Sequence, residues 1–201
     1  KFTEALRGNT SVTHLSVLSS CDWYDGVSHL AEVLEVNRAI VRLVLCSIYI
    51  RSGNARLLAK ALEVNRTIVH LVLNYNKIGS VGASHLAKAL EVNRTLVHLN
   101  LHTNEIGGAG ALDLAAALRE NVTLRELDLG ANHIYDDDVE AICSALLASQ
   151  PLHNRKQEQD AASTTGSSLD IGTPRFGKLC LRRIEITDVG AAALAKLIAA
   201  G

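Results

Sequence analysis

The chain has 201 residues, of which 48% are hydrophobic but only 3% are aromatic. Its 20 basic and 21 acidic residues nearly cancel, so we expect it to bind neither nucleic acid nor a membrane surface through net charge. No apolar run reaches the ~18 residues of a membrane span, no signal peptide is visible, and the 4 cysteines form no Cys-x-x-Cys pair. These absences predict a reduced, intracellular protein, which we place in the cytoplasm, without a zinc or redox motif.

Both ends of the chain lie within a repeating pattern. Residues Lys1–Arg7 read as the tail of a helix, and Ala191–Ala200 read as a helix with nothing to cover its outer side. The sequence also contains no methionine. Because arrays of stacked repeats need polar caps, we expect a fragment that continues into further repeats or another domain at both ends.

A ladder of asparagines divides the chain into units of 28 residues. The ladder consists of Asn9, Asn37, Asn65, Asn93 and Asn121, and the leucines Leu15, Leu43, Leu71, Leu99 and Leu127 keep the same step. A constant period of this length predicts a solenoid of stacked units rather than a globule around one central core. We therefore treat residues 1–201 as a single repeat domain.

The unit that begins at Asn65 shows how each repeat is built. In Leu71–Leu73 alternate leucines predict a short strand with one buried face. Ser80–Val92 carries leucines four residues apart, which form one apolar stripe of a helix. The next asparagine then opens the following unit. Since asparagine tolerates the left-handed conformation that ends many helices, we expect each ladder position to be a helix stop of that kind.

Three consecutive stretches carry a more specific signature. They are LVLNYNKI at Leu71–Ile78, LNLHTNEI at Leu99–Ile106 and LDLGANHI at Leu127–Ile134. This pattern resembles the leucine-rich repeat family, in its ribonuclease-inhibitor-like subtype. The resemblance implies an α/β horseshoe of about six 28-residue repeats, with parallel strands on the concave face and helices on the convex face. Strands stack at ~4.8 Å and helices at ~10 Å, so the helix side has to be the longer, convex side.

Some units depart from this signature at one turn position. Asn76, Asn104 and Asn132 hold the position in the middle units, and Ser20, Ile48 and Ile184 replace them elsewhere. In the family that the chain resembles, these asparagines hydrogen-bond the buried turn backbone. We therefore expect different turns in the first, second and last units.

One interruption breaks the period. Leu127 and Leu179 are 52 residues apart, and the 24 extra residues fall within 150–177, a polar run rich in Ser, Thr, Ala and Gln that holds both prolines. This composition predicts a flexible insertion between a helix and the next strand. A tolerated surface insertion is the simpler interpretation. The alternative is a partner-binding or phosphorylated loop that uses Ser163, Thr164, Thr165, Ser167 or Ser168. The repeat then resumes with a strand at Leu179–Leu181 and a helix at Asp188–Ala200.

The repeat register predicts which side chains face the concave surface, because alternate strand residues point the same way. The first row is His14, Arg42, His70, His98, Glu126 and Lys178; the second is Ser16, Val44, Val72, Asn100, Asp128 and Cys180; the third is Leu18, Cys46, Asn74, His102, Gly130 and Arg182. The face is apolar and mildly basic in its first half and mixed and charged in its second. Such a graded surface suits a protein or peptide ligand. Our candidate partner-binding residues in these rows are Arg42, His70, His98, Asn100, His102, Glu126, Asp128 and Arg182.

The aromatic residues give a second set of candidates. The single Trp and all Tyr fall in segments that join a strand to a helix, and Trp23, Tyr49 and Tyr75 are the candidate binding anchors among them. Trp23 is the first choice, because it lies beside the irregular Cys21-Asp22. The competing interpretation is that rows of small aliphatic side chains exclude aromatics, so that the loops collect them.

Histidines on adjacent strands raise the question of a metal site. His70 and His98 would be neighbours roughly 5 Å apart, and Glu126 flanks His98 on the other side. A pair of histidines without a third suitable ligand is a weak signal, so we expect structural or solvent-facing histidines. We predict no metal, no cofactor and no catalytic residues, since the chain shows no phosphate loop, nucleophile elbow or metal cluster.

The sequence therefore favours a non-catalytic scaffold that binds a protein partner through the concave face and the strand-to-helix loops. One alternative, drawn from the resemblance, is a GTPase-activating protein of the Ran-activator type, which would use polar residues such as Lys77, Asn100 or Arg182. Another is a structural repeat segment of a cytoskeletal or ciliary assembly. Neither the identity of the partner nor the pathway follows from the residues.

Overall fold

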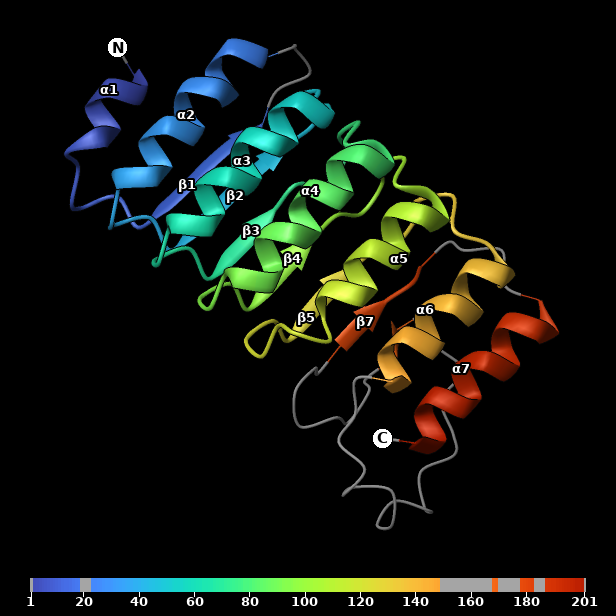
Figure 1. Cartoon of the computed structure of the whole chain (residues 1–201). Coiled ribbons are helices and arrows are strands. Elements are labelled where there is room, and N and C mark those ends of the chain that lie inside the picture. The colour runs from blue at the N-terminus through green and yellow to red at the C-terminus, as the bar shows by residue number, and fades with distance from the viewer. Residues whose placement is uncertain (1, 19–22, 149–167, 170–177, 183–186, 201) are drawn as a thin grey trace.

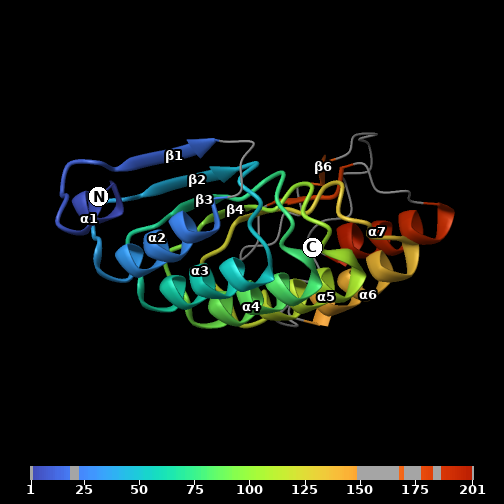
Figure 2. The same ribbon diagram turned by 90° about the horizontal axis from the view of Figure 1, so that it is seen from above.

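The computed structural model describes residues 2–18, 23–148, 168–169, 178–182 and 187–200, and these form two layers (Figure 1). Strands make one layer and helices the other, as the view from above shows (Figure 2). The strands are β1 (His14–Leu18), β2 (Arg42–Cys46), β3 (His70–Val72), β4 (His98–Asn100), β5 (Glu126–Asp128), β6 (Ser168–Leu169) and β7 (Lys178–Cys180). The helices are α1 (Phe2–Arg7), α2 (Tyr24–Val36), α3 (Ser52–Val64), α4 (Gly79–Val92), α5 (Gly107–Ala117), α6 (Asp136–Ala148) and α7 (Asp188–Ala200).

The sheet follows the repeat ladder. Its strand order is β1-β2-β3-β4-β5-β7-β6, and every neighbouring pair from β1 to β7 is parallel. Leu43 is paired with Leu15 on one side and Leu71 on the other, so the leucine ladder stacks in register. The predicted α/β solenoid of parallel strands and outer helices is confirmed.

The interruption leaves the register of the sheet intact. Strand β5 pairs directly with β7, and Leu127 lies opposite Leu179. The insertion was predicted to be a loop throughout, which is wrong at Ser168–Leu169, because this segment forms β6 and pairs antiparallel with β7. An edge strand such as β7 offers unpaired backbone groups, and β6 satisfies part of them. The remaining predicted insertion, with Ser163 to Ser167, lies outside the described residues.

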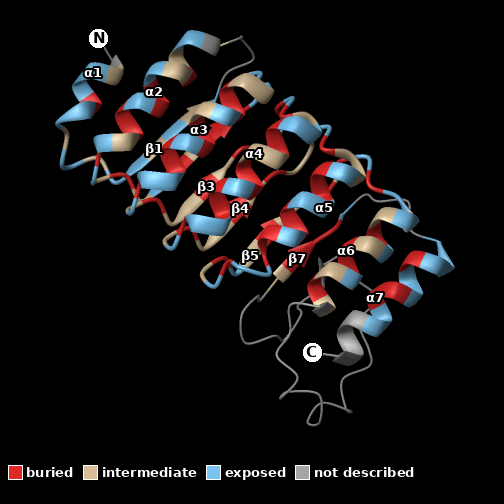
Figure 3. Cartoon of the chain, in the orientation of Figure 1, coloured by how far each residue is buried: buried red, intermediate tan, exposed pale blue. Residues whose placement is uncertain are grey.

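Small aliphatic side chains fill the space between the layers. Each helix turns a buried stripe toward the strands (Figure 3), and one position of that stripe is held by Leu30, Leu58, Leu86, Leu114, Ile142 and Leu194, all 9% exposed or less. Neighbouring helices also approach closely. A Cβ atom at Gly82 of α4 would stand 3.0 Å from Cβ of Ala55 in α3 and 2.6 Å from Cγ2 of Ile78. Glycine at this position thus permits the tight helix stacking.

The asparagine ladder ends the helices, but not in the predicted way. Asn37, Asn65 and Asn93 follow α2, α3 and α4 with extended backbones, at φ of −66°, −70° and −71° and ψ of 136°. The expected left-handed helix stop is therefore wrong. These side chains are at most 2% exposed, and each bonds to backbone groups instead. In Asn65, Nδ2 donates to the carbonyl oxygen of Leu34 at 2.8 Å.

The turns after the strands depend on a second ladder, at Asn76, Asn104 and Asn132. Oδ1 of Asn76 accepts hydrogen bonds from the backbone N–H groups of Ile48 and Ile50, at 3.1 and 3.0 Å. Oδ1 of Asn132 does the same for the N–H groups of Asn104 and Ile106, at 2.7 and 3.3 Å, so both asparagines support the turn of the preceding unit. The turn around Ile48 in the second unit therefore has the same backbone as the turn around Asn104: the flanking residues have φ of 55° and 58° in the first and 54° and 58° in the second. The prediction of a different turn in the second unit is wrong, because the amide that supports this turn comes from Asn76 of the next unit. The turns that hold Ser20 and Ile184 lie outside the described residues.

Candidate functional site

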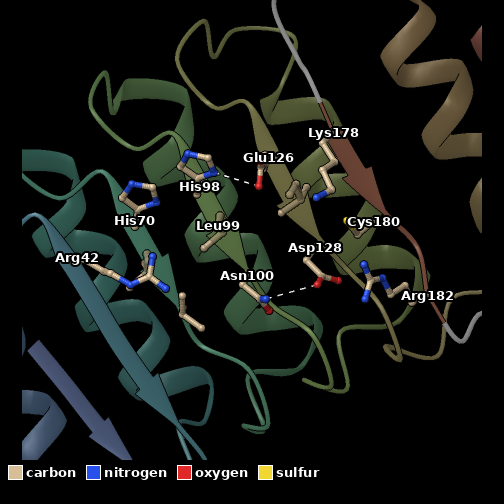
Figure 4. A pocket seen from close by; sticks show the side chains of 13 residues that line it. Arg42, His70, His98, Leu99, Asn100, Glu126, Asp128, Lys178, Cys180 and Arg182 are labelled. Atoms are coloured by element: carbon tan, nitrogen blue, oxygen red, sulfur yellow. Dashed lines mark hydrogen bonds and ion pairs between the residues drawn. The ribbon is translucent and has the colours of Figure 1, made fainter. Parts of the chain in front are cut away.

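The first row of the concave face lies as the register predicted. Arg42, His70, His98, Glu126 and Lys178 stand on successive strands as paired neighbours (Figure 4). The imidazole rings of His70 and His98 are stacked, with centroids 4.2 Å apart and planes inclined by 10°. Nδ1 of His98 lies 3.1 Å from Oε2 of Glu126, which makes an ion pair whenever the imidazole is protonated.

The second and third rows centre on Asp128. Its Oδ1 accepts a hydrogen bond from the backbone N–H of Gly130 at 2.9 Å, and its Oδ2 accepts one from Nδ2 of Asn100 at 3.4 Å. Nδ1 of His102 lies 3.8 Å from Oδ1 of the same carboxylate. A Cβ atom at position 130 would come within 2.6 Å of Nδ1 of His102, so glycine leaves room for the imidazole.

These rows surround an open pocket of 360 Å³ on the strand face (Figure 4). Its lining combines cations, carboxylates, histidines and an amide, contributed by Arg42, His70, Leu71, Val72, His98, Leu99, Asn100, Glu126, Leu127, Asp128, Lys178, Cys180 and Arg182. Seven of the candidate residues are thus brought together: Arg42, His70, His98, Asn100, Glu126, Asp128 and Arg182. Lys178 and Cys180 belong to the predicted rows but were not chosen as candidates, although their place in the register already indicated them.

Burial, together with two neighbouring side chains, lowers the pKa of one histidine in this pocket. Burial lowers the pKa of His70 below its ordinary 6.5, and the nearby His98 and Arg42 lower it further. Glu126 acts in the opposite direction but does not cancel these effects. At neutral pH His70 is therefore an uncharged ring stacked on its neighbour, and it can donate or accept one hydrogen bond at each of its nitrogens.

The geometry of the histidine pair does not suit a shared metal ion. A metal ion bound to an imidazole nitrogen lies in the plane of that ring. The planes of His70 and His98 are nearly parallel and stacked, so no single point lies in both at bonding distance. Within the part of the chain that the structure describes, no three His, Cys, Asp or Glu side chains are grouped to hold a metal ion.

The three aromatic candidates occupy different environments. Tyr75 is 52% exposed and its ring meets His102 edge-on, with centroids 5.7 Å apart, but neither residue lines the pocket. Tyr49 is 40% exposed but does not line the pocket. Trp23 is half-buried against the core, and a Cβ at Gly26 would stand 2.0 Å from its indole. Its ring lies over the start of α2 and is only partly exposed, and its role as a binding anchor stays a prediction.

Two of the three polar groups proposed for a GTPase activator, Lys77 and Asn100, make contacts within the chain. Nζ of Lys77 lies 3.6 Å from Oε1 of Glu105. The amide of Asn100 donates to Asp128, and its Oδ1 accepts the backbone N–H of His102 at 3.0 Å. Both side chains thus hold neighbouring repeats together, whatever else they contact.

Comparison with known proteins agrees with this architecture. The profile of the Leucine Rich repeat family matches residues 64–87, 92–115 and 120–143, three of the units described above. The chain therefore carries leucine-rich repeats in these three units and has the leucine-rich repeat solenoid fold. Comparison with curated protein sequences gave no match. No helix among the described residues is long and apolar enough to cross a membrane.

Two solved structures are similar to the chain. One is leiomodin-1 actin-binding site 2, with 25% sequence identity and a TM-score of 0.62, over 73% of this chain and 86% of that one. The other is the tropomodulin C-terminal domain from Caenorhabditis elegans, with 17% identity and a TM-score of 0.57, over 73% of this chain and 90% of that one. At 17% identity the second likeness concerns the fold alone.

Proposed function

We propose that this protein is a non-catalytic scaffold that binds a protein partner on its concave face, with the 360 Å³ pocket at the centre of the contact. One observation carries the proposal: charged and hydrogen-bonding side chains from five neighbouring parallel strands line this one pocket. A surface that mixes apolar floor residues with polar groups is typical of protein recognition. In this proposal residues 1–201 act as one domain, with the segment at 150–177 as an insertion.

The state of the buried cysteines supports a non-catalytic role. Burial raises the pKa of the Cys143 thiol to about 11 and also raises that of Cys46. At neutral pH both are protonated thiols, which are poor nucleophiles. The carboxylates of Glu126 and Asp128 contact histidine and amide groups rather than a candidate nucleophile.

Actin is the partner that we propose first. The support is the likeness to leiomodin-1 actin-binding site 2, which extends over 73% of the chain at 25% identity. We accordingly propose that the protein acts in the cytoplasm, in association with the actin cytoskeleton, which is close to the cytoskeletal alternative raised by the sequence. The Ran-activator alternative stays a prediction from the resemblance alone.

A binding experiment with purified actin tests both the partner and the face. The chain is titrated against monomeric actin and co-sedimented with filaments, as the parent and as the His70→Ala/His98→Ala double variant. We expect the parent to bind and the variant to lose about tenfold or more in affinity, because truncation of central interface residues costs more than ~1 kcal/mol each.

The matched control removes two histidines from the helices. His29→Ala/His85→Ala changes the same residue type on α2 and α4 and should bind within twofold of the parent. If the parent binds neither form of actin, actin is not the partner. If the helix variant loses affinity as much as the strand variant, the concave face is not the binding surface.

A further inference from the structure

The cations of the pocket differ from its carboxylates in how they are paired. Arg42 on β2, Lys178 on β7 and Arg182 just after β7 all line the pocket. None of the three forms an ion pair with any residue that the structure describes. Figure 4 shows Arg42 at one end of the labelled group and the other two cations at the opposite end.

The carboxylates between these ends already have partners. Glu126 is paired with His98, and Asp128 accepts hydrogen bonds from Asn100 and from the backbone of Gly130. A positive group from a partner would have to compete with these contacts. A negative group would meet cations that need no rearrangement, and charge complementarity of this kind determines which partners a surface accepts.

The separation of the cations sets the length of a matching ligand. Strand β2 is four strand steps from β7 in the order β2-β3-β4-β5-β7. At ~4.8 Å a step the two ends are about 19 Å apart, and an extended peptide at ~3.3 Å per residue covers that distance in about six residues. Between the ends, stacked His70 and His98 and the amide of Asn100 offer hydrogen bonds to a peptide backbone.

We infer that the pocket binds an extended acidic segment of the partner protein, which crosses the strands and places two carboxylates about six residues apart on Arg42 and on Lys178 with Arg182. The inference rests on the proposed function and specifies the chemistry of the segment that the concave face takes. An arginine or lysine segment directed at Glu126 and Asp128 is the opposite arrangement.

Synthetic peptides distinguish an acidic partner segment from a basic one. The probe is a labelled ten-residue peptide of Ser and Thr with Glu at its second and eighth positions, compared with the same peptide carrying Lys there. Anisotropy is followed on the full chain at low ionic strength, up to about 1 mM protein. We expect the Glu peptide to bind, the Lys peptide to bind more weakly, and added salt to weaken the Glu complex.

Variants locate the contact. Arg42→Gln, Lys178→Gln and Arg182→Gln should each weaken the Glu peptide roughly two- to fivefold, as expected for partly exposed charge pairs. Lys88→Gln on the helix face is the matched control and should change nothing. Tighter binding of the Lys peptide, no binding of either peptide, or equal affinity of all variants would each overturn the inference.

Actin binding separates this inference from the proposed function. If actin binds but the triple Arg42→Gln/Lys178→Gln/Arg182→Gln variant binds it equally well, the acidic-segment inference fails while the scaffold proposal stands. If the Glu peptide binds as expected and actin does not, the chemistry of the face holds and the choice of actin fails.

Discussion

Single asparagines connect units that are 28 residues apart. Nδ2 of Asn65 donates to the carbonyl oxygen of Leu34 at the end of α2, and its Oδ1 accepts the backbone N–H groups of Thr67 and Ile68, both at 2.9 Å. The side chain therefore satisfies a helix-end carbonyl of one unit and the entry to the strand of the next. Buried backbone groups of this kind are costly to leave unpaired.

We expect Asn65→Ala to lower the free energy of unfolding by about 2–4 kcal/mol, because it leaves several buried donors and acceptors without partners. The matched control is Asn9→Ala. Asn9 holds the same repeat position and accepts from Ser11 and Val12, but these contacts are exposed or only partly buried. Its loss should cost about 1 kcal/mol or less. Urea denaturation of the three proteins checks the difference, and equal costs would contradict the role assigned to the ladder.

At the scale of the elements, hydrogen bonds join Asp136 at the start of α6 to Thr187, the residue before α7, which lies 51 positions later in the sequence. Its Oδ1 accepts the backbone N–H of Thr187 at 2.9 Å, and the Thr187 hydroxyl donates to Oδ2. These bonds lower the pKa of Asp136 below its ordinary 3.8. A carboxylate with a depressed folded-state pKa stabilises the fold above the unfolded pKa, and this contribution is lost as the pH falls through the folded value.

We therefore expect Asp136→Ala to speed amide hydrogen exchange severalfold at the start of α7, and to leave α3 and α4 unchanged. The parent should lose the same protection only below about pH 4. Asp137→Ala removes the adjacent exposed carboxylate of the same helix and serves as the control. Equal acceleration in both variants, or none in Asp136→Ala, would show that α7 docks without this contact.

The elements also show how far sequence reasoning reaches in a repeat protein. The register of the strands and the neighbours of Arg42, His70 and Glu126 followed from periodicity, because one repeat geometry applies to every unit. The backbone of Asn65 and the turn around Ile48 did not, since their hydrogen bonds come from adjacent units. The environment of Trp23 did not follow either: the pattern places an indole in a loop, but does not show that the ring packs against Gly26 of α2.

At the scale of the whole molecule, each unit depends on its neighbours alone. Among the described elements, every helix packs on the helices before and after it, and no helix contacts one further along the array. Stability in such an array is approximately the sum of unit and interface terms, so a local defect is felt most in adjacent units.

Leu86→Ala in α4 tests this directly. Leu86 is 1% exposed at the centre of the array, and its truncation should cost about 2–5 kcal/mol through lost burial and a residual cavity. Because coupling passes only through neighbouring interfaces, we expect hydrogen exchange to accelerate strongly in α3, α4 and α5 and much less in α7. Leu112→Ala in α5, where the side chain is 40% exposed, should change exchange little anywhere. An equal acceleration in all helices after Leu86→Ala would instead mean that the array unfolds as one cooperative unit.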